Sequence, residues 1–211
     1  MSFYRDHVVP GLTHLVMRQK QLVPFRRRVI GAAEGRVLEI GVGSGLNLPL
    51  YGPAATSIIA LEPSPEFLRM ARTHAAAAAV PVTLLDASAE RIPLDARSVD
   101  TVVTTWTLCT IPNAPLALAE MRRVLKPGGA LLFVEHGRAP EPGVARWQDR
   151  LDPLWSRIAG GCHLNRKMDD LIAGNGFRIE ALVNTRLPGP RTHTFLYEGS
   201  ARPACDDQDT A

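Results

Sequence analysis

The sequence has only three cysteines, Cys109, Cys162 and Cys205, an odd number placed far apart in the chain. This spacing argues against a disulfide framework and against a zinc site, so we expect no bound metal and a reducing, cytoplasmic compartment. No window approaches the roughly 18 consecutive apolar residues of a membrane span. Residues 1–6 also lack the pattern of a signal peptide. We therefore expect no stable membrane insertion.

Charge of one sign is scarce as well, since the formal net charge is +3 over 211 residues. The one basic run, residues 26–28, lacks the interleaved aromatic residues of a nucleic-acid-binding surface. It is interpreted as a solvated helix face, and no nucleic acid is expected as a partner. With 45% hydrophobic and 21% charged residues, the composition is that of one globular domain. We expect a monomer or a weak homodimer.

Apolar runs of strand length alternate with helical patterns from residue 36 onward. Ser64, Pro65 and Glu66 mark a clear helix start, with an N-cap serine, a proline at the first helical position and an acid in the first turn. A second helix is predicted over 113–125. Strands that alternate with helices predict right-handed crossovers and an α/β fold with a parallel sheet. The expected parallel strands are 36–40, 57–61, 82–85, 99–104 and 130–135.

Helical patterns also flank this core on both sides. Residues 1–34 are expected to form an N-terminal helical lid, and residues 140–173 a helical insert at the acceptor site. Within the insert, a helix is predicted over 146–159, and Pro153 is expected to kink or split it. Asn165 is a good N-cap for a second helix.

Two β-like runs close the domain, which is expected to span residues 35–199. The runs 177–184 and 192–197 are near enough in sequence to favour an antiparallel pair at the end of the sheet. The acidic tail 200–211 is expected to be disordered.

Three glycines, Gly41, Gly43 and Gly45, follow the first predicted strand as G-x-G-x-G, a pattern that serves dinucleotides, nucleoside triphosphates and S-adenosylmethionine. A P-loop needs a lysine and a hydroxyl residue next, whereas Leu46-Asn47 follows; a dinucleotide loop needs its third glycine one residue later. Glu39, two residues before the first glycine, would repel a pyrophosphate. The same acid would stabilise the sulfonium and ammonium groups of S-adenosylmethionine, so the loop favours that cofactor.

Acidic residues end three successive strands. Glu62 ends the second strand about twenty residues after the loop, the spacing at which an acid binds both ribose hydroxyls of a nucleoside. Asp86 and Ala87 end the third strand, where they can meet an adenine amino group. Residues 104–108 end the fourth strand beside the switch point at which open α/β sheets bind ligands. This set predicts a nucleoside-containing cofactor.

Together these stretches resemble the class I S-adenosylmethionine-dependent methyltransferases over roughly residues 35–136. The resemblance implies a Rossmann-like, seven-stranded, mostly parallel sheet with an antiparallel last strand and helices on both faces. It also implies S-adenosylmethionine as cofactor and S-adenosylhomocysteine as product. The matching segments are EIGVGSG (39–45), LEPS (61–64), LDASAERIP (85–93), SVDTVVT (98–104) and RVLKPGG (123–129). The candidate cofactor-binding residues are Glu39, Gly41, Gly43, Gly45, Asn47, Glu62, Pro63, Asp86, Ala87, Thr104, Thr105 and Leu108.

Beyond the common core, residues 147–155 and 161–166 are similar to the insert of the methyltransferase-like branch. That branch includes thiol methyltransferases, and many bacterial members are labelled as phospholipid or quinone methyltransferases. This sequence lacks the long apolar N-terminal anchor of the animal members, so their membrane association is not expected here.

The chemistry of methyl transfer favours a thiol acceptor. In-line displacement requires an aligned nucleophile and exclusion of water. A thiol is already a few per cent thiolate at pH 7, whereas an aliphatic alcohol needs a dedicated general base. His136, just past the fifth strand, is the first candidate base and His163 the second, although either could be an ordinary hydrogen-bonded histidine. Cys109 and Cys162 are interpreted as buried small residues.

The acceptor is expected to be a small lipophilic molecule. Trp147 and Trp155 are either core residues or a roof over its pocket. The other candidate substrate-binding residues are Tyr4, His7, Trp106 and Asn165. Alternative functions are O- or C-methylation of a phenolic, quinone-precursor or lipid acceptor, noncatalytic S-adenosylmethionine binding, and NAD-dependent oxidation.

Overall fold

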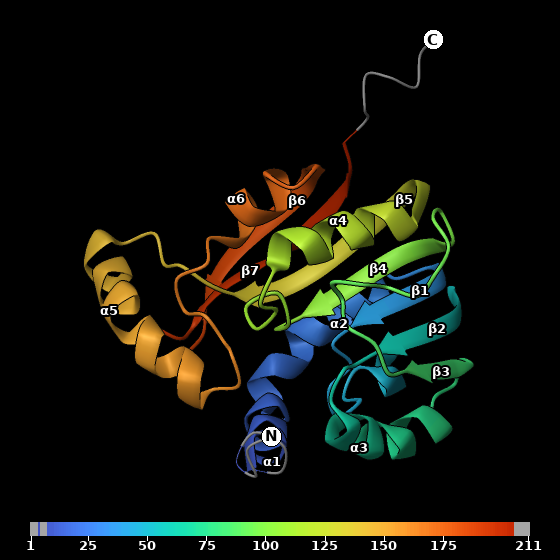
Figure 1. Cartoon of the computed structure of the whole chain (residues 1–211), viewed down its shortest axis with the longest axis horizontal. Helices are drawn as coiled ribbons and strands as arrows, with labels where there is room; N and C mark the ends of the chain where they lie inside the picture. The colour runs from blue at the N-terminus through green and yellow to red at the C-terminus, as the bar shows by residue number, and fades with distance from the viewer. Residues whose placement is uncertain (1–3, 5–7, 205–211) are drawn as a thin grey trace.

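A seven-stranded sheet forms the centre of the computed structural model, which describes residue 4 and residues 8–204. Its strand order is β3-β2-β1-β4-β5-β7-β6, and only β7 runs against its neighbours (Figure 1). The expected mostly parallel sheet with an antiparallel last strand is therefore confirmed. The strands are β1 (Gly35–Ile40), β2 (Ala55–Leu61), β3 (Val82–Leu85), β4 (Val99–Thr105), β5 (Leu125–His136), β6 (Phe177–Arg186) and β7 (Phe195–Pro203).

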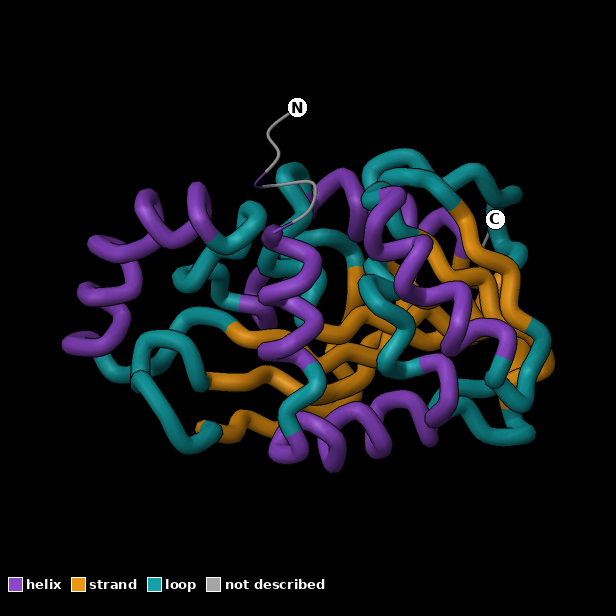
Figure 2. Tube along the Cα trace, turned by 90° about the horizontal axis from the view of Figure 1, so that it is seen from below, coloured by secondary structure: helices purple, strands orange, loops and turns teal. Residues whose placement is uncertain are grey.

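Helices cover both faces of this sheet (Figure 2). Two of them begin where the sequence predicts, because the Ser64 hydroxyl accepts a hydrogen bond from Phe67 N and the Asn113 side chain accepts one from Leu116 N. The helices are α1 (Val9–Met17), η2 (Lys20–Leu22), α2 (Val23–Gly31), η3 (Leu48–Leu50), α3 (Pro65–Ala76), α4 (Ala114–Val124), α5 (Pro142–Ile158) and α6 (Met168–Ala173). No helix of the described residues is long and apolar enough to cross a membrane.

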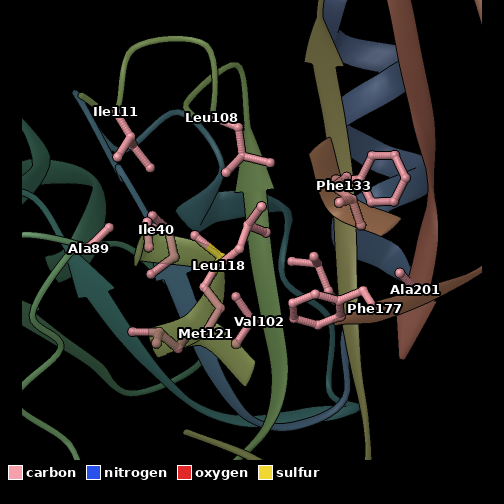
Figure 3. Close-up of a cluster of buried hydrophobic side chains, with 14 of the residues drawn as sticks. Ile40, Ala89, Val102, Leu108, Ile111, Leu118, Met121, Phe133, Phe177 and Ala201 are labelled. Atoms are coloured by element: carbon pink, nitrogen blue, oxygen red, sulfur yellow. The ribbon is translucent and has the colours of Figure 1, made fainter. Parts of the chain in front are cut away.

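Alternate residues of the central strands build two hydrophobic clusters on opposite faces of the sheet. One face joins Ile40, Val102 and Phe133 to α4 and α6, and Figure 3 shows part of this cluster. The other face joins neighbouring strand residues such as Val37 and Val103 to α2 and α3. Burial on both faces explains why these strands read as continuous apolar runs.

Helix α5 stands at one end of the molecule (Figure 1, Figure 2). Pro153 lies inside this helix, which continues to Ile158, so of the two expected effects, a kink or a split, the split is not found. Ala145, Gln148 and Asp152 are buried on one side of α5. Gln148 and Asp152 attach this side of α5 to the rest of the chain, since Gln148 accepts from Ala139 N and Asp152 accepts from Leu164 N.

Two expectations for the C-terminal third are wrong. Asn165 does not cap α6, which starts at Met168 after Lys167; its side-chain amide instead donates a hydrogen bond to Asp149, 3.1 Å away. Residues 200–203 are not disordered but belong to β7, where Ala201 is paired with both β5 and β6 and fully buried. Residues 205–211 lie outside the described residues.

Gly199 allows β6 and β7 to pair closely. A Cβ at this position would overlap the carbonyl oxygen of Ala181 and approach the Phe133 ring. We expect Gly199→Ala to lower the free energy of unfolding by about 1–3 kcal/mol, the usual cost of overpacking. Gly52→Ala is the matched control, because a Cβ there meets no atom within 4 Å. Chemical denaturation measures both, and equal stability of the two variants would contradict the close approach.

Candidate functional site

The glycine loop follows β1 directly. Gly41, Gly43 and Gly45 have φ angles of 66°, 53° and 83°, a region that L side chains rarely adopt. A Cβ at Gly41 would overlap the Thr107 side chain, and one at Gly45 would lie 3.1 Å from Ala71 Cα. The loop therefore needs glycine for its backbone angles and for the close approach of its neighbours.

Glu62 lies beside this loop at the carboxyl end of β2, and Asp86 follows the carboxyl end of the neighbouring strand β3. The Glu62 carboxylate accepts hydrogen bonds from Gly43 N and Ser64 N, both at 3.0 Å, and burial raises its pKa. Asp86 is exposed and lines an open cavity of about 410 Å³ together with Pro65, Leu68, Arg72 and Leu84. The structure thus places Glu62 and Asp86, the residues predicted to bind ribose and adenine, at the carboxyl ends of two adjacent strands. Pro63 and Ala87 follow these two residues in the chain.

Glu39 is buried beneath the glycine loop. Its carboxylate accepts hydrogen bonds from Asn47 Nδ2 at 2.8 Å and from the Tyr51 hydroxyl at 2.9 Å. Asn47 also donates to Thr105 Oγ1 at 2.9 Å. Burial raises the pKa of Glu39 to about 7 despite these partners. Glu39 and Asn47 therefore brace the loop, while their direct contact with a cofactor stays a prediction.

Arg26 of α2 completes this buried network. Its guanidinium donates to Asn47 Oδ1 at 2.6 Å and to Met17 O at 3.1 Å, and it stacks 4.9 Å from the centre of the Trp106 ring. Burial lowers the pKa of Arg26 to about 10. The interpretation of residues 26–28 as a solvated face is wrong for Arg26, which shares the buried side of its helix with Val29 and Ile30. That helical spacing was the signal in the sequence that could have found it.

Helix α1 lies over the glycine loop. His14 Nδ1 shares a hydrogen bond of 2.8 Å with Ser44 Oγ, inside the loop. The Tyr4 hydroxyl donates to Ile158 O, 2.9 Å away at the end of α5. Sequence reasoning missed His14, and the predicted substrate-binding residue His7 lies outside the described residues. The lid expected over residues 1–34 stays a prediction, as does its movement.

Glu135, at the end of β5, organises the turn after β4. Its Oε1 accepts hydrogen bonds from Thr104 Oγ1 at 2.7 Å, Thr107 N at 3.0 Å and Leu108 N at 3.1 Å. Its Oε2 is buried and has no hydrogen-bond partner among the described residues. Burial raises the pKa of Glu135. Sequence reasoning missed this residue because an acid inside an apolar run gave no spacing to a partner.

His136 lies next to two cysteines. Its Nε2 is 2.9 Å from Cys162 Sγ, and the ligand atoms of Cys109, His136 and Cys162 all lie within 4.8 Å of one another. A hydrogen bond from Cys109 and the nearby His136 outweigh burial and lower the pKa of Cys162 to about 4. The same hydrogen bond and burial raise the pKa of Cys109. Distance in the sequence was therefore a poor guide, because the fold brings Cys109 and Cys162 together.

His163 belongs to a second polar pair. Its Nδ1 is 2.8 Å from Asp152 Oδ2, and the other Asp152 oxygen accepts from Leu164 N at 2.6 Å. Trp155 packs edge-on against His193, with ring centres 4.4 Å apart, and its indole helps to lower the pKa of Cys162 after Cys109 and His136. Trp147 is 56% exposed and packs against Arg150. The two tryptophans therefore differ in environment, and Trp155 is the one at the Cys109–His136–Cys162 cluster.

The fold and the glycine-loop site define a class I S-adenosylmethionine-dependent methyltransferase. A family model described as a methyltransferase domain matches residues 38–133. A solved S-adenosylmethionine-dependent methyltransferase of Methanosarcina mazei superposes with a TM-score of 0.66 at 21% identity, covering 81% of this chain and 93% of that one. At this identity the superposition shows the fold alone.

Curated relatives carry the assignment further. Phosphatidylethanolamine N-methyltransferase of Cereibacter sphaeroides is 33% identical over 82% of this chain and 85% of that protein. Thiol S-methyltransferase TMT1B of Rattus norvegicus is 36% identical over 64% of this chain and 56% of that protein. The chain therefore spans little more than half the length of this thiol methyltransferase. It belongs to the S-adenosylmethionine-dependent methyltransferase family, with S-adenosylmethionine as cofactor.

The buried carboxyl of Glu39 should leave a signature in the pH dependence of stability. Its folded pKa of about 7 lies above the ordinary 4.5, so folding favours the protonated form, and stability falls as pH rises between these values. Relative to Glu39→Gln, we expect the cofactor-free wild type to lose on the order of 3 kcal/mol between about pH 4.5 and about pH 8. Urea denaturation across this range measures the difference.

The exposed residue Glu34 supplies the control, since Glu34→Gln should change the pH profile little. Parallel stability curves for the wild type and Glu39→Gln would show that Glu39 is not protonated on folding.

Proposed function

We propose that this methyltransferase transfers its methyl group to the sulfur of a small lipophilic thiol. The observation that carries the proposal is the hydrogen-bonded His163–Asp152 pair. It lies next to the turn after β4, because His163 N donates to Cys109 O. A thiol needs only mild base assistance, which one oriented histidine supplies. The similarity to a thiol S-methyltransferase supports the same acceptor.

The residues at the glycine loop fit S-adenosylmethionine. Positive φ angles and the lack of Cβ atoms would let the loop backbone approach a ligand. The Glu62 carboxylate lies at the loop, where it accepts a hydrogen bond from Gly43 N. When bound, the cofactor supplies an electrophilic methyl group on a sulfonium. Glu62 would hold its ribose and Asp86 its adenine, as the order of the strand ends suggests.

The chain's own residues would then align the acceptor and receive its proton. His163 is proposed to take the thiol proton, and Asp152 to fix the orientation of its ring. Trp155 is proposed to border the acceptor, whereas Tyr4 and α1 would limit the entry of water from the cofactor side. The compartment is proposed to be the cytoplasm, in keeping with the free thiols of Cys109 and Cys162.

A lipid acceptor is the second candidate. The relative of Cereibacter sphaeroides is named for phosphatidylethanolamine and matches most of both chains. In addition, α1 and α5 expose large apolar side chains that would suit a lipid, namely Leu12, Leu15, Val16, Trp147, Leu154 and Ile158. Methylation of phospholipid vesicles but not of thiols would select this candidate.

A panel of acceptors tests the proposal directly. With S-adenosylmethionine labelled on the methyl group, we expect label in lipophilic thiols, little in hydrophilic thiols and none in phospholipid vesicles. Transfer to vesicles alone would overturn the thiol assignment.

The Glu62 carboxylate is expected to hold the cofactor. Glu62→Gln should weaken cofactor binding by about tenfold or more, because a hydrogen bond to a charged group contributes about 1.5–3 kcal/mol. Calorimetry measures that binding, with Glu180→Gln on β6 as control.

The role of His163 predicts a dependence on the acidity of the acceptor. We expect His163→Gln to slow alkyl thiols by up to about 100-fold, the lower end of base catalysis, and to slow acidic aryl thiols much less. Asp152→Asn should change the rates in the same sense by a smaller factor, since it acts through the orientation of His163. A plot of log kcat against thiol pKa measures this selectivity. An equal loss for all thiols would assign His163 a structural role instead.

A further inference from the structure

Three segments that are far apart in the sequence bring two cysteines and a histidine together. Cys109 follows β4, His136 ends β5, and Cys162 lies in the loop between α5 and α6. Their ligand atoms lie within 4.8 Å of one another, and His136 Nε2 is 2.9 Å from Cys162 Sγ. His163 N donates to Cys109 O at 2.8 Å, which ties the Cys162 loop to the turn after β4. The cluster is therefore held by backbone as well as by side chains.

We propose that Cys109, His136 and Cys162 bind a zinc ion. Zinc prefers thiolate and imidazole ligands in tetrahedral geometry, at about 2.3 Å from sulfur and about 2.0 Å from nitrogen. Neighbouring ligand atoms in such a site lie roughly 3.5–3.8 Å apart. The His136–Cys162 pair would have to separate by about 0.6 Å from its present hydrogen bond, a shift that side-chain rotation supplies.

The charges around the cluster favour a cation. Glu135 is fully buried, its Oε2 has no hydrogen-bond partner among the described residues, and its charge acts on both Cys109 and His136. Arg166 is the nearby cation, but its NH1 donates to the carbonyl oxygens of Leu108 and Ile111. A divalent ion would neutralise two thiolates and would leave Arg166 to balance Glu135.

Three protein ligands leave the fourth position of a tetrahedral ion open, as in catalytic zinc sites. The turn that carries Cys109 also contacts the glycine loop through Thr107. In a role that rests on the proposed thiol specificity, the open position would take the acceptor sulfur, whose S–H bond breaks as its proton passes to His163. The methyl–sulfur bond of the cofactor would then break as the acceptor sulfur–methyl bond forms. The thioether product, a weaker ligand, would leave.

Zinc binding is measurable on the whole chain without any acceptor. The protein is reduced, stripped with a chelator and titrated with Zn²⁺ against a chromophoric competitor, and Co²⁺ is then used as a spectroscopic probe. We expect one ion per chain and thiolate-to-cobalt charge-transfer bands. Cys162→Ser and His136→Asn should each weaken binding more than about 100-fold, beyond the loss typical of outer-shell changes. Cys205→Ser, the matched cysteine control, should bind like the wild type.

Circular dichroism and thermal melting check that each variant folds, and His136→Asn keeps the proposal testable if loss of a cysteine prevents folding. Zinc binding to the wild type no stronger than to folded Cys162→Ser would overturn the site. So would a Cys109–Cys162 disulfide whose reduction yields no zinc binding. Thiol methylation by a chain that binds no zinc would contradict the zinc site and leave the proposed thiol acceptor standing. Zinc binding without methylation of any thiol would contradict the proposed thiol acceptor and leave the zinc site standing.

Discussion

The carboxyl group of Glu39, buried beneath the glycine loop, is the group on which this loop, the proposed cofactor site, depends. Its two oxygens accept hydrogen bonds from Asn47 and Tyr51. Asn47 in turn accepts a hydrogen bond from Arg26 and donates one to Thr105. Removing one hydrogen-bond partner from such a buried polar group typically costs about 1–3 kcal/mol, because the remaining donor or acceptor is left unsatisfied. The loop therefore keeps its strained backbone angles through a network that ties α2, β1 and β4 together.

A second buried acid, Glu135, stabilises the turn after β4. Glu135 gathers one hydroxyl and two backbone N–H groups of the turn over residues 104–108. Trp106, in the middle of this turn, has a φ of 52°, an unfavourable value for a non-glycine residue. Three hydrogen bonds to one carboxylate oxygen hold the turn against that strain, and so fix the direction in which Cys109 leaves the sheet.

The fold around the proposed cofactor site could be predicted from the sequence because its signals are local. The glycine pattern, the acids at strand ends such as Glu62, and the caps Ser64 and Asn113 each act within a few residues, and the structure confirms the sheet and helices that they predict. The proposed acceptor site depends on contacts between distant segments. His136 and Cys162 are 26 residues apart yet share a hydrogen bond. A contact between segments this far apart has no periodic pattern in the sequence from which it could be predicted. The extension of β7 was missed for a related reason, since pairing with two neighbouring strands outweighed the polar composition of residues 200–203.

The turn after β4 joins these two proposed sites physically. Thr105 accepts from Asn47 on the cofactor side, Thr104 donates to Glu135 on the acceptor side, and Thr107 donates to Gly41 O at 3.5 Å. Because successive side chains of a strand point to opposite faces, neighbouring threonines can serve two networks at once. Any ligand that shifts the glycine loop would act on the turn, and through it on Cys109 and Glu135. In-line transfer needs the two reacting atoms aligned closely, so a short turn anchored on both sides would fix the proposed acceptor site relative to the proposed site of the methyl donor.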